Sequence, residues 1–446
     1  MTRQPAATPR APRQRAPGAT PRHAPHITPR DYIPQDTLYV WALVNPAHPV
    51  LAGSVSLSQL VPNCATFTYA SDWWEFALSE DLPLIAGQLF SAGHKDSAPG
   101  AIDDARPDRW GERIIRHVDR PARLSILEML LFAGDDRFGA LGISTSADQY
   151  IPRRIGPYPQ LRDLDALVRA VEEVQAQAPV TTEMQRLVQP GVTLGGARPK
   201  ALLQTERGAC VIKFSELDDA VDTPLIEHAT MTLAAQAGIQ VATTGVLPLA
   251  APHAGRRQRH ALTIERFDRV QIHQMDLRVH CISARTALTA AGLAESYGAL
   301  ATVLLRQAHP DRQKALREEL FRRMVFNILM DNTDDHERNH CLRLGFDGYY
   351  DLAPAFDVVP TLQNMGYQAM VVGRHGAEAT VDNALTELSE FGITRARAIA
   401  LVQDVARTVD RWPAYFRQMG VGAADMEALA ASIDRPALKM QRDEYC

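Results

Sequence analysis

The chain has 446 residues, of which 46% are apolar, 22% charged and 7% aromatic. This composition is typical of a globular protein, and the length allows roughly two to four domains with sizeable apolar cores. Because no apolar run approaches about 18 residues and the N-terminus lacks the apolar stretch of a signal peptide, we expect neither a membrane span nor secretion. The five cysteines are scattered without a CxxC pair, which excludes a disulfide framework and a zinc ribbon and favours a reducing, cytoplasmic environment.

Charge is distributed unevenly along the chain. Residues 1–36 contain six Arg, two acidic residues and eight Pro, for a charge of +4, whereas the remaining residues contain 41 basic and 50 acidic side chains, for a charge of −9. A segment this poor in large apolar side chains cannot bury enough surface to order itself, so we expect 1–36 to form a disordered basic tail. Basic tails can contact nucleic acid, but a solvated leader is the more frequent role.

The segment 37–150 has the pattern of an α+β unit. Apolar and β-branched runs predict three strands, and helical spacing predicts two helices. The strands are expected at 38–44, 50–57 and 66–70, and the helices within 106–118 and 124–133.

The next two segments, 151–282 and 283–446, differ in their strand content. The first contains helices, a hairpin and further strands, whereas the second is mostly helical apart from a strand pair near 341–352. The helices of the first segment are expected at 161–175 and 223–238, the hairpin at 201–205 and 209–214, and the strands at 241–249 and 260–268. Because strands come early and helices late, we predict an α+β fold rather than a doubly wound sheet.

A glycine-containing segment, GVTLGGARPKALL at 191–203, overlaps the start of the predicted hairpin. Gly195 and Gly196 allow positive φ angles, so that consecutive backbone N–H groups can surround the oxygens of a phosphate group. Arg198 and Lys200 add positive charge to the same segment. The segment therefore predicts a phosphate-binding loop, with an ordinary turn between two elements as the alternative.

Lys213 lies between Ile212 and Phe214 in the run VIKF. An ammonium group flanked by large apolar side chains is costly unless it reaches water or an anion. Glu227 follows 14 residues later on the predicted helix, and protein kinases hold nucleotide phosphates with a strand Lys that pairs with a helix Glu. We interpret Lys213 as a candidate phosphate ligand; on an amphipathic strand it would instead face water.

The segment NILMDNTDDHERNH at 327–340 places a dense polar run at the end of an apolar helical pattern. Asp334 and Asn339 have the D-x-x-x-x-N spacing of the kinase catalytic loop, in which the Asp accepts the hydroxyl proton and the Asn binds a metal ion. A solvated helix-capping loop is the alternative. Asp357 follows Asn339 by 18 residues across the predicted strand pair, where kinases have a second metal-binding Asp, although an Asp at this position can also cap a turn.

Two other interpretations of these motifs are weaker. His336, His340 and Cys341 could bind zinc, but their spacing matches no standard site and the surrounding oxygen ligands favour Mg²⁺. The H-R-D and D-F-G signatures of conventional eukaryotic-type protein kinases are absent, so membership of that class is not expected.

Taken in order, the motifs resemble those of the HipA family, the serine/threonine kinase toxins of bacterial type II toxin–antitoxin systems. The resemblance covers nearly all of 37–415. It is carried in the N-terminal part by LPLIAGQLF, ARPDRWGERI and GDDRFGALGI, and in the C-terminal part by TLGGARPKALL, VIKF, ALTIERFDR, FNILMDNTDDHERNH and DLAPAFDVVP. It implies a HipA-like kinase fold with an N-terminal α+β subdomain over 37–150. A bilobal kinase-like core would follow, with a nucleotide-binding part over 151–282 and a mainly helical catalytic part over 283–446.

The resemblance also implies roles for individual residues. Asp334 would be the catalytic base, supported by His336, and Asn339 and Asp357 would bind Mg²⁺. The implied ATP ligands are Lys213, the loop residues Gly195, Gly196, Ala197, Arg198 and Lys200, and the adenine-binding hinge residues Glu265 and Phe267.

Two positions depart from the family pattern. Thr193 stands where the family has an autophosphorylated Ser, whose phosphorylation displaces the loop and silences the kinase. Because Thr can also accept phosphate, Thr193 is a candidate autophosphorylation site, with slower or absent autoregulation as the alternative. Asp335 stands where some relatives have Gly, and an added carboxylate near the metal ions would either tighten Mg²⁺ binding or repel ATP.

The sequence thus predicts an ATP- and Mg²⁺-dependent serine/threonine protein kinase. By resemblance, its acceptor would be a protein, with an aminoacyl-tRNA synthetase as one candidate. Its partner would be a HipB-like helix-turn-helix antitoxin, through which any contact with DNA would be made. An inactive binding module that acts as a corepressor with such an antitoxin is the alternative, and a kinase for small molecules is a third interpretation. Competent residues at every catalytic position favour an active kinase.

Overall fold

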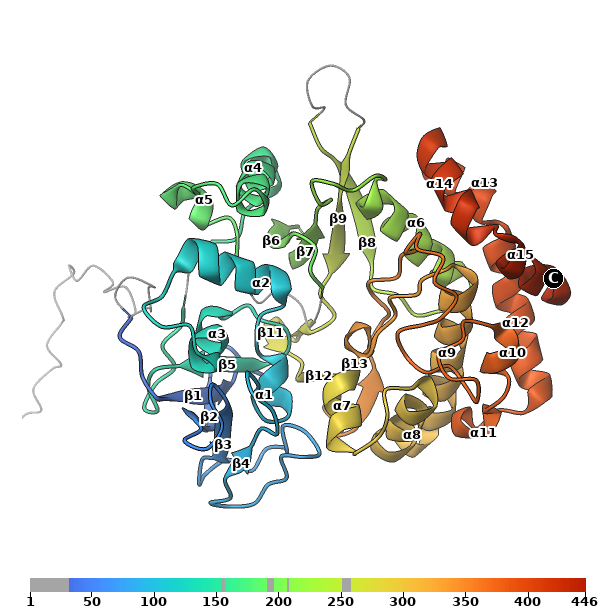
Figure 1. The fold of residues 1–446 in the computed structure, drawn as a ribbon. Coiled ribbons are helices and arrows are strands. Elements are labelled where there is room, and N and C mark those ends of the chain that lie inside the picture. The colour runs from blue at the N-terminus through green and yellow to red at the C-terminus, as the bar shows by residue number, and fades with distance from the viewer. Residues whose placement is uncertain (1–31, 154–156, 191–195, 207, 251–257) are drawn as a thin grey trace, which may run out of the picture.

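The computed structural model describes residues 32–153, 157–190, 196–206, 208–250 and 258–446, and Figure 1 shows their arrangement. Most of the expected tail, 1–31, lies outside these residues. The end of the expected tail packs onto the first folded unit: the buried Tyr32 hydroxyl donates to the Glu128 carboxylate at 2.8 Å, and Arg123 binds Asp36 at 2.6 Å. The composition of the tail did not indicate this contact, because one aromatic residue changes the average apolar content of 36 residues very little.

The N-terminal unit is a five-stranded antiparallel sheet in the order β4-β3-β2-β1-β5, with one helix, α3, packed across β1, β2 and β5. Its strands are β1 (Thr37–Ala42), β2 (Val50–Leu57), β3 (Ala65–Tyr69), β4 (Phe90–Ser91) and β5 (Leu141–Ser144), and its helices are α1 (Ala101–Asp104), α2 (Arg109–Ile114) and α3 (Ile126–Phe132). The three predicted strands and two predicted helices are confirmed. The pattern did not predict β5, which begins at the end of the glycine-containing run GDDRFGALGI and is stabilised by pairing with β1.

A second antiparallel sheet, in the order β6-β7-β9-β8, lies at the centre of the molecule in Figure 1. Its strands are β6 (Lys200–Thr205), β7 (Gly208–Lys213), β8 (Thr244–Pro248) and β9 (His260–Glu265), and the nearby helices are α4 (Leu164–Gln175), α5 (Thr182–Gln185) and α6 (Thr223–Gln236). Because side chains alternate along a strand, Ile212 packs with Leu167 of α4, whereas Val211 belongs to the core that includes α6. Lys213, two residues after Val211, is therefore directed toward α6.

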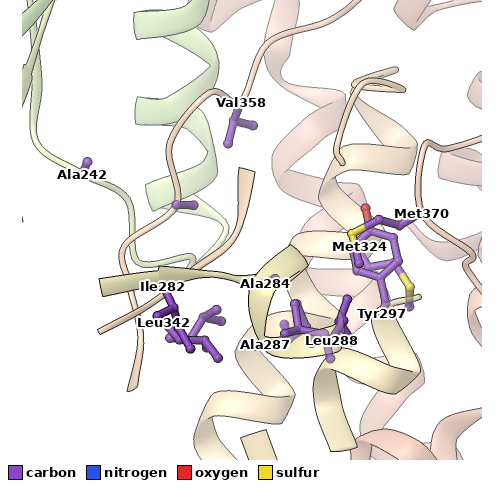
Figure 2. Close-up of a cluster of buried hydrophobic side chains, with 14 of the residues drawn as sticks. Ala242, Ile282, Ala284, Ala287, Leu288, Tyr297, Met324, Leu342, Val358 and Met370 are labelled. Atoms are coloured by element: carbon purple, nitrogen blue, oxygen red, sulfur yellow. The ribbon is translucent and has the colours of Figure 1, made fainter. Parts of the chain in front are cut away.

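The C-terminal part is mainly helical, as predicted. A hairpin of β10 (Arg269–Ile272) and β11 (Met275–Arg278) precedes a small sheet of β12 (Cys281–Ser283), β13 (Cys341–Leu344) and β14 (Tyr350–Leu352), which includes the strand pair predicted near 341–352. The helices are α7 (Ala284–Ala290), α8 (Tyr297–Gln307), α9 (Pro310–Leu329), α10 (Val381–Ala384), α11 (Leu388–Phe391), α12 (Arg395–Asp410), α13 (Trp412–Gln418), α14 (Ala423–Ile433) and α15 (Pro436–Tyr445). Figure 2 shows Ile282 of β12 and Leu342 of β13 in a buried cluster with Leu288 of α7 and Met324 of α9.

One apolar core connects the N-terminal sheet with the C-terminal helices. A single buried cluster contains Phe67 of β3, Leu130 of α3, Leu262 of β9 and Phe326 of α9. The antiparallel sheets and the concentration of helices in the C-terminal part confirm the α+β class. Over the described ranges, no helix combines the length and the apolar character that crossing a bilayer requires.

Candidate functional site

A cleft of about 860 Å³ lies where the N-terminal unit, the central sheet and the loop after α9 meet. Segments that are far apart in the sequence contribute most of its lining. They are the turn at 106–109, the start of β6 with the end of β7, the loop 332–339 and the segment 357–369. The predicted site residues in its lining are Gly196, Ala197, Arg198, Lys200, Lys213, Asp334, His336, Asn339 and Asp357. The fold therefore brings together in one cavity residues that were selected from separate motifs.

Lys213, the last residue of β7, joins two acidic groups. Its Nζ lies 2.6 Å from Oε1 of Glu227 on α6 and 2.6 Å from Oδ1 of Asp357. Burial alone would lower the pKa of Lys213, but the attraction of Asp357 and Glu227 outweighs it and holds the pKa above the usual value for lysine. The side chain is only 7% exposed, so the alternative in which Lys213 faces water does not apply.

Asp357 is held opposite Lys213 by the backbone before it. Ala355 accepts a hydrogen bond from the Ala242 N–H at 2.9 Å and donates one to the Gln240 carbonyl at 2.7 Å, which attaches this segment to the chain entering β8. Burial alone would raise the pKa of Asp357, but the charge of Lys213 lowers it to about 2, so the carboxylate is ionised at neutral pH. Asp357 has a φ of 59°, a left-handed conformation that Asp tolerates better than most residues.

The loop after α9 presents Asp334 to the cleft. The Asp334 carbonyl oxygen accepts hydrogen bonds from the His336 N–H at 2.9 Å and from Asn339 Nδ2 at 3.0 Å, so its carboxylate is not needed to hold the loop. Partial burial raises the pKa of Asp334, and the negative charges of Asp357 and Asp335 act in the same direction. A carboxylate with a raised pKa is a stronger proton acceptor than an ordinary Asp.

The oxygen atoms of Asn339 and Asp357 fit a magnesium ion. Asn339 Oδ1 is buried and has no hydrogen-bond partner within the described part of the chain, whereas Nδ2 of the same side chain is engaged. An amide oxygen and an ionised carboxylate lining one cleft are donors of the type that Mg²⁺ prefers. For the zinc alternative, the described residues include no group of three or more His, Cys, Asp or Glu that could hold a metal ion.

Asp335 does not face the cleft, which corrects the expectation of an additional acid near the metal ions. Its buried carboxylate accepts hydrogen bonds from Asn327 Nδ2 at 2.7 Å and from the Tyr297 hydroxyl, and lies 3.0 Å from His340 Nε2. Burial alone would raise the pKa of Asp335, but His340 outweighs this effect and lowers it. Asp335 therefore anchors the loop to α8 and α9, and Asp334, which precedes it, is left facing the cleft.

The predicted phosphate-binding loop is described only from Gly196 onward; Gly195 and Thr193 lie outside the described residues. Gly196 has a φ of 104°, and a Cβ atom at this position would lie 2.7 Å from Lys200 Nζ. Both observations favour glycine at this position. Ala197, the next residue, is exposed at the cleft.

The positive groups of this loop are bound to acids of other elements. Lys200 Nζ lies 2.7 Å from Asp108 Oδ2, with both side chains buried, and the Trp110 indole N–H donates to the Lys200 carbonyl at 2.7 Å. Arg198 binds Asp219 at 2.6 Å. No motif in the sequence pointed to Asp108, which also caps the N-terminus of α2 by accepting a hydrogen bond from the Gly111 N–H.

Glu265 and Phe267, predicted to contact adenine, are not among the residues that line this cleft. Glu265 ends β9, and its backbone N–H donates to the Thr243 carbonyl at 2.9 Å. The Phe267 ring packs against Phe138 and Phe356, with centroids 5.3 and 5.7 Å away. The structure thus places both residues on the chain leaving the central sheet, and their adenine-binding role stays a prediction.

Two family models match this chain. The model described as the HipA N-terminal domain matches residues 48–144, and the model described as the HipA-like C-terminal domain matches residues 192–412. The second interval contains all of the motif residues of the cleft from Gly196 to Asp357.

Individual proteins are also similar. A Haemophilus influenzae protein named "Putative kinase" is 26% identical over 200 residues, which are 40% of this chain and 55% of that protein; the chain thus spans about half of this curated relative. A chain of the solved complex of HipA, HipB and operator DNA from the Shewanella oneidensis MR-1 toxin–antitoxin system matches with a TM-score of 0.61 at 17% identity, covering 92% of this chain and 97% of that one. The Helicobacter pylori proinflammatory kinase CtkA matches with a TM-score of 0.41 at 13% identity, over 56% of this chain and 92% of that one. The likeness to the Shewanella complex shows a shared fold.

Proposed function

The chain belongs to the HipA family, and on this premise we propose that it is a kinase that uses ATP and Mg²⁺ to phosphorylate a Ser or Thr hydroxyl of a protein. The observation that carries the proposal is the meeting of Lys213, Asp334, Asn339 and Asp357 in one cleft. They supply a cation for phosphate groups, a proton acceptor and two oxygen ligands for a metal ion. Phosphoryl transfer depends mainly on positioning and charge stabilisation by groups of these kinds.

In the proposed reaction, each residue has one task. Lys213 would hold the nucleotide phosphates, and Glu227, which is 1% exposed, would keep the lysine ammonium in place from α6. Asp334 would orient the acceptor hydroxyl and accept its proton. The hydrogen bond from Asn339 to the Asp334 carbonyl would hold the proton acceptor at a constant position relative to this metal ligand.

Asn339 Oδ1 and the Asp357 carboxylate would hold Mg²⁺, which when bound stabilises negative charge on the transferred phosphoryl group. The lowered pKa of Asp357 supports this role, because an ionised carboxylate is available throughout the neutral range. The Oδ1 of Asn339 supports it as well: it has no hydrogen-bond partner among the residues that the structure describes, and a buried oxygen without a partner is costly.

Intact mass after incubation with Mg²⁺ and ATP tests the proposal, with Asp334→Asn as the matched variant. The wild type is expected to gain phosphate or to transfer it to an added protein acceptor. The variant should fold and bind ATP, because the loop is held by the backbone carbonyl of Asp334, but it should transfer phosphate about 10²–10⁴-fold more slowly. Phosphate transfer at the wild-type rate by the folded variant would show that Asp334 is not the proton acceptor. A wild type that binds no ATP in calorimetry would exclude the proposed kinase activity.

The acceptor is proposed to be a protein in the cytoplasm, with an aminoacyl-tRNA synthetase as one candidate. This proposal rests on membership of the family. A screen for phosphate transfer to purified synthetases and to hydroxylated small molecules would distinguish a protein acceptor from a small-molecule acceptor. The same ATP site would serve in both cases.

We also propose a helix-turn-helix antitoxin as the binding partner. The fold shared with a chain of the HipA, HipB and operator DNA complex supports this partner. The charge of −9 outside residues 1–36 disfavours direct contact with phosphates, so DNA would be reached through the antitoxin. In a mobility-shift experiment at about 0.15 M salt, the chain alone should not retard operator DNA, whereas the chain with a HipB-like antitoxin should; Asp334→Asn should behave like the wild type.

A further inference from the structure

The cleft continues beyond Asp334 along the segment 359–369, to which no role has been assigned so far. Alternate residues of this segment, from Val359 to Tyr367, line the cavity. The side chains of Met365 and Tyr367 are 39% and 52% exposed. Two neighbouring exposed apolar side chains in a cavity with charged walls are suited to contact an apolar group of a ligand.

The segment 359–369 is attached to the part of the loop that precedes Asp334. The Thr361 N–H donates to the Asp331 carbonyl at 3.0 Å, the Ala369 N–H donates to the Thr333 carbonyl at 3.1 Å, and the two threonine hydroxyls lie 2.6 Å apart. Asn339, in contrast, follows Asp334 and donates through Nδ2 to the Asp334 carbonyl at 3.0 Å. A molecule lying along 359–369 would therefore present a hydroxyl beside the loop that carries Asp334.

Gln368 has an unusual position within this segment. It is 2% exposed and lines the cleft, yet neither Nε2 nor Oε1 has a hydrogen-bond partner within the described part of the chain. Its backbone N–H donates to the Ala377 carbonyl at 2.7 Å, which keeps the residue in place. A buried amide with a free donor and a free acceptor is costly, and it complements a group that offers one acceptor and one donor, such as a main-chain peptide unit.

We propose that this half of the cleft binds the acceptor as an extended peptide. The Gln368 amide would pair with a main-chain peptide group of the acceptor, and Met365 and Tyr367 would contact a large apolar side chain next to the phosphorylated Ser or Thr. The inference rests on the proposed kinase function and specifies the acceptor of that same site.

Gln368→Leu tests the inference, because it removes the donor and the acceptor while nearly conserving volume. Since the amide has no hydrogen-bond partner among the described residues, the melting temperature should stay the same or rise by about 1–2 °C. With a positional-scanning library of Ser- and Thr-containing decapeptides as the probe, the peptide KM should rise about tenfold. The affinity for ATP, measured by calorimetry, should not change. Gln418→Leu, at an exposed position on α13, is the matched control.

The wild type should select a large apolar residue beside the acceptor, and Tyr367→Ala, which truncates a side chain that is 52% exposed, should weaken this selection. An unchanged peptide KM for both variants would overturn the inference. A loss of ATP affinity in Gln368→Leu would also overturn it, because the amide would then contact the nucleotide. A wild type that hydrolyses ATP but phosphorylates no peptide would overturn the peptide acceptor and leave the kinase intact, whereas a wild type without ATP binding would overturn both.

Discussion

Two lysines face each other across β6 and β7, and the protein neutralises them in different ways. Lys200 and Lys213 are directly opposite in the strand register, an arrangement of like charges that is unfavourable without counter-charges. Lys213 meets Glu227 on α6 and Asp357 in the C-terminal part, whereas Lys200 meets Asp108 of the N-terminal unit. The first lysine belongs to the group of residues proposed to carry out the reaction, and the second attaches the predicted phosphate-binding loop to another unit.

This difference shows that the N-terminal unit is part of the site rather than a separate appendage. Besides the contact between Asp108 and Lys200, Asp104 of α1 accepts hydrogen bonds from the Ser283 N–H and hydroxyl, each at 2.7 Å. Ser283 ends β12 at the start of the helical part. The N-terminal unit therefore contacts both the central sheet and the helical part that frame the cleft.

Removing the contacts of Lys213 with Glu227 and Asp357 should have the largest effect on stability and on ATP binding. Lys213→Met keeps the length of the side chain but leaves the buried Glu227 and the partly buried Asp357 as neighbouring acids without a counter-charge. Removing one member of a buried ion pair costs about 3–5 kcal/mol, so the free energy of unfolding should fall by about that amount and ATP binding should be lost. Urea denaturation and calorimetry measure the two effects, with Lys213→Arg as the charge-conserving control. Unchanged stability and ATP affinity would show that the pair is dispensable.

A smaller effect is expected for the Lys200 contact. Asp108→Asn retains a side-chain oxygen for the α2 N-cap but removes the charge beside Lys200, so stability should fall by about 1–3 kcal/mol. Affinity for ATP should fall only a few-fold, because Lys213 is untouched. Asp108→Ala should cost about 1 kcal/mol more through loss of the cap. If Asp108→Asn weakened ATP binding as strongly as Lys213→Met, the division between a reactive and an anchoring lysine would be wrong.

The pH dependence should show the smallest and most gradual effect. Asp334 must be ionised to accept a proton, and its pKa is raised above 3.8, so kcat/KM should begin to fall on acidification at a higher pH than for an ordinary Asp. Asp357 has a pKa lowered to about 2; its stabilising contribution is complete above 3.8 and is lost only as the pH falls toward 2. On acidification, the pH–rate profile should therefore show loss of activity at a higher pH than that at which thermal melting shows loss of stability. Parallel loss of activity and folding would contradict these assignments.

The local parts of the site were predictable because they follow from short-range patterns. The alternation along β7 and the helical spacing of α6 placed Lys213 and Glu227 on adjoining elements, and the spacing within the loop placed Asp334 near Asn339. The strand pair between this loop and Asp357 was also predicted. These features depend on neighbours in the sequence, and the structure contains all of them.

Other parts were not predictable, because they depend on which distant segments come together. Asp335 and Asp334 are adjacent and chemically identical, yet Asp335 is buried among Tyr297, Asn327 and His340 while Asp334 faces the cleft. Nothing in a run of two acids distinguishes them. Only the packing of α8 and α9 does so, because it supplies buried donors to one carboxylate and leaves the other to the cavity.

By itself, the sequence determined the chemistry available to the site: the residue types, their spacing and the elements that carry them. The tertiary structure decided which of these groups meet. It bound Lys200 to Asp108 across more than 90 positions of the chain and turned Asp335 inward. It also left the Gln368 amide, at the wall of the cleft, without a hydrogen-bond partner in the described ranges. The physical reason is that periodicity and propensity act over a few residues, whereas ion pairing and burial of polar groups depend on long-range packing.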